Sequence, residues 1–128
     1  MKWKIIPESW SGPLLSLLRI VTALLFIAHG TNKYFGIPPN EGGPPAILSM
    51  PGIAGIFELV FGTLILIGLF TRVSAFLMSG MMAVAYWLVH APNSFYPSVN
   101  HGEPAILFCF IFLYIASAGP GPWSVDKG

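Results

Sequence analysis

The stretch FELVFGTLILIGLFTR, which runs from Phe57 to Arg72, decides the fold of this chain. It carries one acid near its start, Glu58, and one base at its end, and most of the residues between them are apolar. It belongs to an apolar segment over Gly52–Phe70. At about 1.5 Å of rise per residue, a helix of this length crosses the roughly 30 Å hydrocarbon core of a bilayer. Lipid offers no hydrogen bonds to a backbone, so this segment is predicted to be a membrane helix.

Further apolar segments lie on either side of this one. They span Pro13–Ala28, Val73–Ala91 and Pro104–Ala118. The first and the last are slightly short, and their polar flanks are expected to extend them. The run GIPPNEGGPP at Gly36–Pro45 is typical of a loop, whereas only Thr71 and Arg72 separate the second segment from the third. We therefore predict an all-α fold: a four-transmembrane-helix bundle, formed by residues 1–128 as a single domain, with a tight antiparallel hairpin at its centre.

The composition also indicates a membrane protein. Of the 128 residues, 55% are hydrophobic and 9% are charged, whereas a soluble domain carries about 25% charged residues. The net charge of +1 gives no electrostatic support for nucleic-acid binding, so we expect none. The single cysteine, Cys109, excludes a disulfide within one chain and a CxxC redox motif. The expected partners are the lipid bilayer and either other membrane subunits or further copies of this chain.

Basic residues fall unevenly on the two sides of the predicted bundle. If the N-terminus is cytoplasmic, Lys33 alone lies on the outer side. The inner side then receives Lys2, Lys4, Arg19, Arg72 and Lys127. Because cytoplasmic flanks of membrane helices are enriched in Lys and Arg, both termini are predicted to be cytoplasmic. Arg19 is expected to extend its head group to the inner surface. Arg19 or Arg72 is expected to pair with Asp126 and hold the C-terminal tail across the bundle.

The same topology gathers many of the other polar residues in one layer near the outer, periplasmic side. This layer comprises His29, Lys33, Glu58, His90, Asn100, His101 and Glu103. Glu58 is its most informative member, because a carboxylate inside a membrane helix is costly and usually faces the bundle or a cavity. Gly55 and Gly62 flank it on the same helical face and permit close approach of another helix. We predict a ligand or proton site here, with a structural ion pair as the alternative.

Several chemistries are compatible with this layer. His29 and His90, on different helices at similar depth, would suit two haem ligands, and together with Glu58 they would suit a metal ion. Their spacing is specific for neither, so no metal is predicted and haem is disfavoured. His29, Glu58 and His101 would instead serve as a proton relay to a quinone-like ligand, because histidine titrates near neutral pH. Lys33 would hold an anionic substrate or simply lie at the membrane interface. The cofactor stays open, with a quinone as the candidate.

Three blocks of the sequence resemble the DoxX family of small four-helix membrane proteins. They are AHGTNKYFG at 28–36, FELVFGTLILIGLFTR at 57–72, and NHGEPAILF with AGPGPWSVD around the fourth segment. The matching positions are His29, Gly30, Lys33, Phe35, Gly36, Glu58, Gly62, Gly68, Arg72, Asn100, Gly102, Glu103, Gly119, Gly121 and Asp126. The resemblance covers nearly the whole chain. It implies a four-helix membrane bundle in a bacterial or archaeal cytoplasmic (inner) membrane.

The resemblance also implies a redox association, since named members include a subunit of a thiosulfate:quinone oxidoreductase. We therefore predict a multi-pass membrane subunit associated with a quinone-linked redox system, with its site in the outer polar layer. If the chain takes part in catalysis, we expect an oxidoreductase subunit rather than a self-sufficient enzyme. Two alternatives stay open: a non-catalytic accessory subunit of a larger membrane complex, and a small transporter formed by oligomers. A flavin or nicotinamide enzyme is disfavoured, because no Gly-rich turn joins a strand to a helix.

Overall fold

The structure, a computed structural model, describes residues 3–127, and all regular secondary structure in that range is helical. The elements are η1 (Glu8–Trp10), α1 (Ser11–Phe35), α2 (Met50–Ile67), α3 (Thr71–Ala85), η2 (Tyr86–His90), η3 (Ala91–Asn93), α4 (Pro97–Asn100) and α5 (Glu103–Ala118). Elements η1 and η3 are 3-10 helices, and η2 is a π-helix that continues α3. The prediction of an all-α protein is confirmed.

Among the described residues, three stretches of helix are long and apolar enough to cross a membrane. They are Glu8–Phe35, Met50–Ile67 and Thr71–Asn93. Helix α5 is also apolar but shorter, at 16 residues. The expected extension of the first helix is confirmed, since α1 continues through polar residues, among them Thr31 and Lys33, as far as Phe35. By the length and composition of its helices, the chain is a multi-pass membrane protein.

The turn between α2 and α3 lies earlier in the chain than predicted. Helix α2 ends before Gly68, which takes the left-handed conformation with a φ of 72°. Thr71 and Arg72, which were predicted to form the turn, are instead the first residues of α3. The reason is a distant contact. The Asp126 carboxylate accepts hydrogen bonds from the Phe70 and Thr71 main-chain N–H groups at 3.0 and 2.8 Å. It thereby satisfies donors that the start of a helix leaves free.

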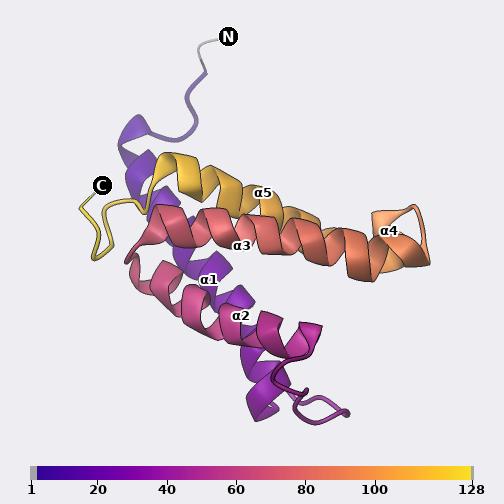
Figure 1. The fold of residues 1–128 in the computed structure, drawn as a ribbon. Helices are drawn as coiled ribbons and strands as arrows, with labels where there is room; N and C mark the ends of the chain where they lie inside the picture. Colours follow the sequence, from indigo (N-terminus) through magenta and orange to yellow (C-terminus); the bar gives the residue numbers. More distant parts are fainter. Residues whose placement is uncertain (1–2, 128) are drawn as a thin grey trace.

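The long helices form two pairs that diverge from each other (Figure 1). Helix α1 packs along α2, and α3 packs along α5. The pairs meet near the turn that joins α2 to α3 and separate toward the other end of the molecule. We call the end that carries this turn and the C-terminal tail (residues 119–127) the closed end. The end that carries Phe35, the loop at 36–49 and η3 is the open end.

Glycines allow α1 and α2 to lie close together. A Cβ atom at Gly62 would come within 2.6 Å of Cγ1 of Ile27, and one at Gly30 would come within 2.8 Å of Cγ of Leu59. Both separations are shorter than the roughly 3.5–4.0 Å of a favourable carbon contact. A larger residue at either position would push the helices apart. Small residues at helix contacts are typical of membrane proteins, where close packing replaces the hydrophobic effect as the source of attraction.

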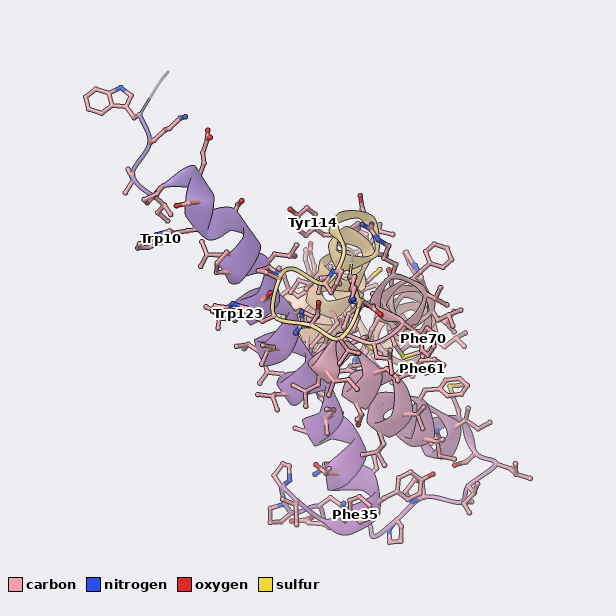
Figure 2. The ribbon with its side chains drawn as sticks, turned by 90° about the vertical axis from the view of Figure 1, so that its left-hand side faces the viewer. Trp10, Phe35, Phe61, Phe70, Tyr114 and Trp123 are labelled. Atoms are coloured by element: carbon pink, nitrogen blue, oxygen red, sulfur yellow. The ribbon has the colours of Figure 1, made fainter. Side chains whose placement is uncertain are left out.

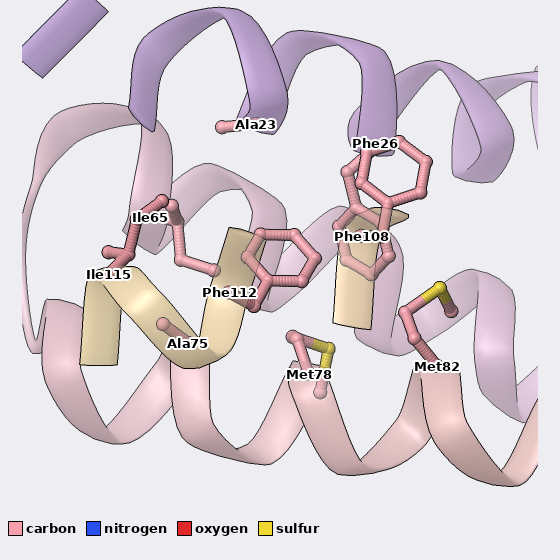
Figure 3. Close-up of a cluster of buried hydrophobic side chains, with 9 residues drawn as sticks. All are labelled: Ala23, Phe26, Ile65, Ala75, Met78, Met82, Phe108, Phe112 and Ile115. Atoms are coloured by element: carbon pink, nitrogen blue, oxygen red, sulfur yellow. The ribbon is translucent and has the colours of Figure 1, made fainter. Parts of the chain in front are cut away.

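The core lies between the two pairs and consists of aromatic, aliphatic and methionine side chains (Figure 3). It comprises Ala23, Phe26, Ile65, Ala75, Met78, Met82, Phe108, Phe112 and Ile115. The ring of Phe26 meets those of Phe108 and Phe112 edge-on, at centroid separations of 5.6 and 4.9 Å. Aromatic quadrupoles favour this arrangement. These contacts join α1 of one pair to α5 of the other.

The C-terminal tail holds the closed end together. It follows α5 and crosses to α1 and to the end of α2. The Trp123 main-chain N–H donates to Oγ of Ser16 at 3.0 Å, and the Asp126 N–H donates to the Gly68 carbonyl at 2.8 Å. Figure 2 shows Trp123 beside α1, with Trp10 toward the same end of that helix. The tail therefore ties the second helix pair to the first.

Arg19 is fully buried at the closed end, with 0% of its surface exposed. The prediction that it extends to the inner surface is therefore wrong. Its Nη1 donates to the Pro120 carbonyl, and its Nη2 donates to the carbonyls of Trp123 at 2.5 Å and Leu66 at 3.4 Å. These acceptors lie at or just beyond the C-terminal ends of α2 and α5, where the helix dipole favours a cation. The acceptor on Pro120 is 101 residues away in the chain, so sequence spacing gives no sign of it.

Asp126 and Arg72 complete the closed end. Hydrogen bonds from the main-chain N–H groups of Thr71 and Phe70, with the charge of Arg19 nearby, hold the pKa of Asp126 below its usual range. Arg72 donates through Nη1 to carbonyls in the last turn of α5, at positions 116 and 117. The closed end is thus held largely by contacts between side chains and the main chain.

Candidate functional site

A cavity of about 820 Å³ is lined by residues of both helix pairs and lies toward the open end. Most of its lining is apolar, and both pairs contribute to it. The apolar residues are Phe26, Met50, Pro51, Ile53, Ala54, Phe57, Met81, Met82, Val84, Ala85, Val89, Pro104, Ala105 and Phe108. The polar residues are His29, Lys33, Glu58, His90 and His101. This size and lining suit a small molecule, because ligand sites are mostly apolar with a few polar groups that fix orientation.

An ion pair between Lys33 and Glu58 is the most buried polar feature of the cavity wall. The Lys33 Nζ lies 2.7 Å from Oε1 of Glu58, and the two side chains are 26% and 5% exposed. Lys33 comes from the last turns of α1 and Glu58 from the middle of α2. Gly55 makes room for the lysine, since a Cβ atom there would lie 3.2 Å from Cδ of Lys33. The close approach expected of these helices is therefore present, and Lys33 is paired with Glu58 across it.

His29 lies one helical turn before Lys33 on α1 and borders the same cavity. Its ring meets that of Phe108 edge-on, with a centroid separation of 5.9 Å. This contact joins α1 to α5 across the gap between the pairs. His29 is thus placed between the core and the ion pair, with one side against an aromatic ring.

His90 borders the cavity from the opposite pair and is anchored by the main chain. It is the last residue of the π-helix η2. Its Nδ1 lies 3.0 Å from the carbonyl oxygen of Asn100. Asn100 itself is buried, with 2% exposed, and its Nδ2 lies 3.2 Å from Oη of Tyr86. π-helical turns are rare in proteins, but those that occur often lie at functional sites. The turn at Tyr86–His90 is therefore a second feature that indicates a site at this cavity.

The structure brings together five of the seven residues predicted for the polar layer. The five that border the cavity are His29, Lys33, Glu58, His90 and His101. Asn100 faces Tyr86 and the loop before it rather than the cavity, and Glu103 is exposed at the start of α5. Glu103 is the first residue of α5, and the helix dipole favours a carboxylate at that position.

Within residues 3–127, no group of three His, Cys, Asp or Glu side chains is close enough to hold a metal ion. The polar groups of the cavity instead form one ion pair and separate imidazoles, distributed over both helix pairs. Such a set can donate hydrogen bonds to a ligand oxygen and can accept or return a proton. It sits in an apolar space, where each such interaction is stronger than in water.

Comparison with known proteins supports the same family as the sequence blocks do. Residues 14–91 match the family model DoxX, which covers more than half of the chain. This chain belongs to the DoxX family. The match includes most of α1 and all of α2, α3 and η2. It therefore covers the cavity residues of this DoxX protein except those from residue 101 onward. The resemblance predicted from the sequence is confirmed.

Two known proteins are similar to this DoxX protein along nearly its whole length. An uncharacterized protein of Haemophilus influenzae is 39% identical over 125 residues, which are 94% of this chain and 93% of the relative. An uncharacterized membrane protein of Mycobacterium tuberculosis is 27% identical over 143 residues, which are 98% of this chain and 86% of the relative. No solved structure matches the chain. Together with its helices, the family makes this a DoxX membrane protein embedded in lipid.

Sequence reasoning missed two parts of the cavity. The first is its apolar lining, in which Phe57, Met81 and Met82 belong to helices that read only as membrane segments. The second is the π-helical turn at Tyr86–His90, which rotates the end of the third helix relative to a regular α-helix. A Trp-Leu-Val run after Tyr86 carries no signal for such a turn.

Proposed function

We propose that this protein is an integral subunit of a quinone-linked redox system and that its cavity binds the quinone. The observation that carries the proposal is the buried Lys33–Glu58 pair in the wall of a largely apolar cavity of about 820 Å³. A buried ionisable pair inside a membrane bundle usually marks a functional site. The redox association itself comes from the resemblance to DoxX proteins described above.

The residues of the cavity fit a quinone. Its carbonyl oxygens need hydrogen-bond donors, and the Lys33 ammonium and the imidazoles of His29 and His101 can supply them. Its apolar tail needs an apolar surface, which Phe57 and Met81 offer. A quinone, when bound, supplies two-electron, two-proton redox chemistry. The chain contributes the binding site and the proton-carrying side chains, while the electrons are assigned to a partner subunit.

Each polar residue has a separate part in this proposal. Lys33 donates to a carbonyl oxygen of the ligand, and Glu58 keeps the ammonium charged and aimed into the cavity. His29 and His101 exchange protons between the ligand and the water at the open end, because an imidazole nitrogen can accept a proton while the other nitrogen donates one. The apolar lining excludes water from the remainder of the cavity.

The proposed orientation places the open end on the periplasmic side of a bacterial or archaeal inner membrane. Both termini are then cytoplasmic, and α5 crosses the bilayer as a fourth helix, so that residues 1–128 form one domain. Lys4, Arg72 and Lys127 would lie on the cytoplasmic side, with Lys33 on the other, as the distribution of basic residues favours. A quinone would enter the cavity from the outer leaflet, between the diverging pairs.

A non-catalytic accessory subunit is the second candidate. The observation that favours it is that Lys33 and Glu58 already satisfy each other at 2.7 Å, as an internal brace would. Such a subunit would dock on a larger membrane complex through its lipid-facing helices. It would need the ion pair for stability but would bind no quinone.

Quinone retention separates the two candidates. We expect protein purified in native-lipid particles to retain bound quinone, and Glu58→Gln to bind decylubiquinone about tenfold more weakly. That is the effect of losing one charge-assisted hydrogen bond worth about 1.5 kcal/mol. Glu103→Gln is the matched control, because Glu103 is exposed and outside the cavity lining. Its affinity for decylubiquinone should equal that of the wild type.

Thermal unfolding of both variants in the same lipid distinguishes a lost site from a lost fold. Wild-type protein that retains no quinone and does not bind decylubiquinone would refute the proposal. A quinone-binding protein in which Glu58→Gln and Glu103→Gln behave alike would refute the part assigned to the ion pair.

A further inference from the structure

The hydrogen bond between His90 and Asn100 fixes which nitrogen of the imidazole carries the proton. A main-chain carbonyl oxygen can only accept a hydrogen bond. The contact of 3.0 Å between the Asn100 carbonyl and Nδ1 of His90 therefore requires a proton on Nδ1. In a neutral imidazole the other nitrogen, Nε2, then carries a lone pair. Because the ring borders the cavity, Nε2 is the polar atom that His90 offers to a ligand.

The carbonyl that sets this tautomer is itself held in place by the Asn100 side chain. Asn100 is 2% exposed, and its Nδ2 donates to Oη of Tyr86 at 3.2 Å and to the Ser94 carbonyl at 3.0 Å. Its Oδ1 accepts from the Gly102 main-chain N–H at 2.8 Å. Contacts on both sides of the amide leave this residue little freedom to rotate. The acceptor for His90 is therefore rigid.

The π-helical turn brings the donor to this acceptor. Tyr86 and His90 are the first and last residues of η2, and their ring centroids are 6.5 Å apart. Tyr86 contacts the Asn100 side chain, while His90 contacts the Asn100 main chain. One buried residue, Asn100, thus contacts both ends of the π-helical turn and links the end of the third helix to the segment before α5.

The other titratable groups of the cavity lack such an arrangement. Among the hydrogen bonds of residues 3–127, Lys33 and Glu58 bind each other, whereas the rings of His29 and His101 have no main-chain partner that sets a tautomer. His101 is exposed, and it has a left-handed backbone with a φ of 63°. His90 is therefore the imidazole of the cavity whose free nitrogen is specified by the fold.

We infer that His90 is a further proton-exchanging residue of the cavity, beside His29 and His101, and that Asn100 holds it as the Nδ1–H tautomer with Nε2 toward the ligand. This inference rests on the proposed quinone site. When His90 receives a proton from a ligand hydroxyl, Nε2 forms the new N–H bond, the O–H bond breaks and its electron pair stays on oxygen. Nδ1 keeps its own proton and its bond to the Asn100 carbonyl. The imidazolium later releases the Nε2 proton to water at the open end.

Nitrogen-15 NMR of histidine-labelled full-length protein in lipid nanodiscs tests the tautomer directly. At alkaline pH, where imidazole is neutral, we expect the His90 signals of a ring protonated at Nδ1 and unprotonated at Nε2. His90→Asn identifies these signals by removing them. An Nε2–H tautomer, or rapid exchange between the two tautomers, would overturn the inference even in a protein that binds quinone.

A matched pair of variants tests the proton role. Asparagine at position 90 places its amide nitrogen near the Nδ1 position and keeps the donor to Asn100, but it has no equivalent of Nε2. Glutamine reaches the Nε2 position but loses the donor to the carbonyl. We expect His90→Asn to keep the thermal stability and quinone content of the wild type, while kcat of the quinone-linked activity in host membranes falls at least tenfold and KM stays unchanged. We expect His90→Gln to lose stability as well.

Unchanged kcat in His90→Asn would overturn the proton role. A fixed Nδ1–H tautomer in a protein that binds no decylubiquinone would overturn the proposed function and the proton role with it. The reverse result, quinone binding with the other tautomer, would overturn the inference alone.

Discussion

Each end of the molecule holds a cation among its helices, but the partners of the two cations differ. At the closed end, Arg19 donates to main-chain carbonyls, including those of Pro120 and Trp123. At the open end, Lys33 donates to a carboxylate, that of Glu58. Carbonyls cannot change their protonation, and they move only if their segment of chain moves. A carboxylate can take up a proton or turn to another donor. The closed end is therefore a fixed joint, whereas the open end has a pair that can exchange partners.

The largest effect on stability is expected at the closed end. Arg19→Met should cause the largest loss of stability, because it leaves the carbonyls of Pro120 and Trp123 without their donor in a buried place. Hydrogen bonds to a charged group contribute about 1.5–3 kcal/mol each, and breaking a buried ionic contact costs about 3–5 kcal/mol. We expect a loss of about 3 kcal/mol or more. Thermal unfolding in nanodiscs, followed by circular dichroism, measures it.

Lys4→Met is the control for removing a positive charge. Nζ of Lys4 lies 2.6 Å from Oε1 of Glu8, but the two side chains are 68% and 80% exposed. Exposed ion pairs contribute about 1 kcal/mol at most, so this variant should unfold close to the wild type. If Arg19→Met were as stable as Lys4→Met, the hydrogen bonds of Arg19 would not hold the closed end together.

The packing of α1 against α2 gives the next largest effect. Gly30→Ala would place a Cβ atom 2.8 Å from Cγ of Leu59 and 3.1 Å from the Gly55 carbonyl oxygen. Overpacking of this kind costs about 1–3 kcal/mol, and we expect it to weaken decylubiquinone binding because it separates the helices that carry Lys33 and Glu58. Unfolding and binding titrations in the same lipid measure the two effects.

Gly80→Ala is the matched control, since a Cβ atom at Gly80 would meet nothing within 4 Å. Replacing a glycine inside a helix by alanine stabilises the helix by about 0.5–1 kcal/mol. Gly80→Ala should therefore unfold at the wild-type temperature or slightly above it. An equal loss of stability in Gly30→Ala and Gly80→Ala would show that the close contact at Gly30 does not cause the loss.

The smallest effect is expected at Asp126. Asp126→Asn should cost less than about 1 kcal/mol at neutral pH, as for other helix-capping residues near the surface. Because the pKa of Asp126 is lowered in the folded protein, its contribution is complete above the unfolded pKa of about 3.9. It is lost as the pH falls through the folded pKa. The unfolding temperatures of wild type and variant should therefore converge below about pH 4. A gap that widens in acid would contradict this account.

The helices and the main contact at the open end could be predicted from the sequence, because both depend on local patterns. Apolar length fixes where α2 lies to within a few residues, and a lone acid such as Glu58 in a membrane segment indicates a partner on another helix. Lys33 follows from its spacing, since it lies one turn after His29 at the end of the same apolar run. The length of the apolar segments and the buried charge of Glu58 were sufficient to predict the helices and the contact at the open end.

The closed end could not be predicted in the same way, because its contacts join residues far apart in the chain. Arg19 lies six residues after the start of the apolar segment Pro13–Ala28, close enough to the N-terminal end for its head group to be expected at the surface. Its burial depends on the path of the tail, which no pattern in α1 specifies. The contact of the Asn100 amide with Tyr86 could not be predicted either, because it depends on a π-helical turn for which the sequence carries no signal.

The contact between Arg19 and the tail also constrains how the protein is made. Arg19 is translated 101 residues before Pro120, whose carbonyl it binds. A charged arginine without acceptors is costly in hydrocarbon, so the first helix reaches its final depth only after Pro120 and Trp123 have been made. A chain truncated before Pro120 would lack these two acceptors, so its first helix would carry a buried arginine without them.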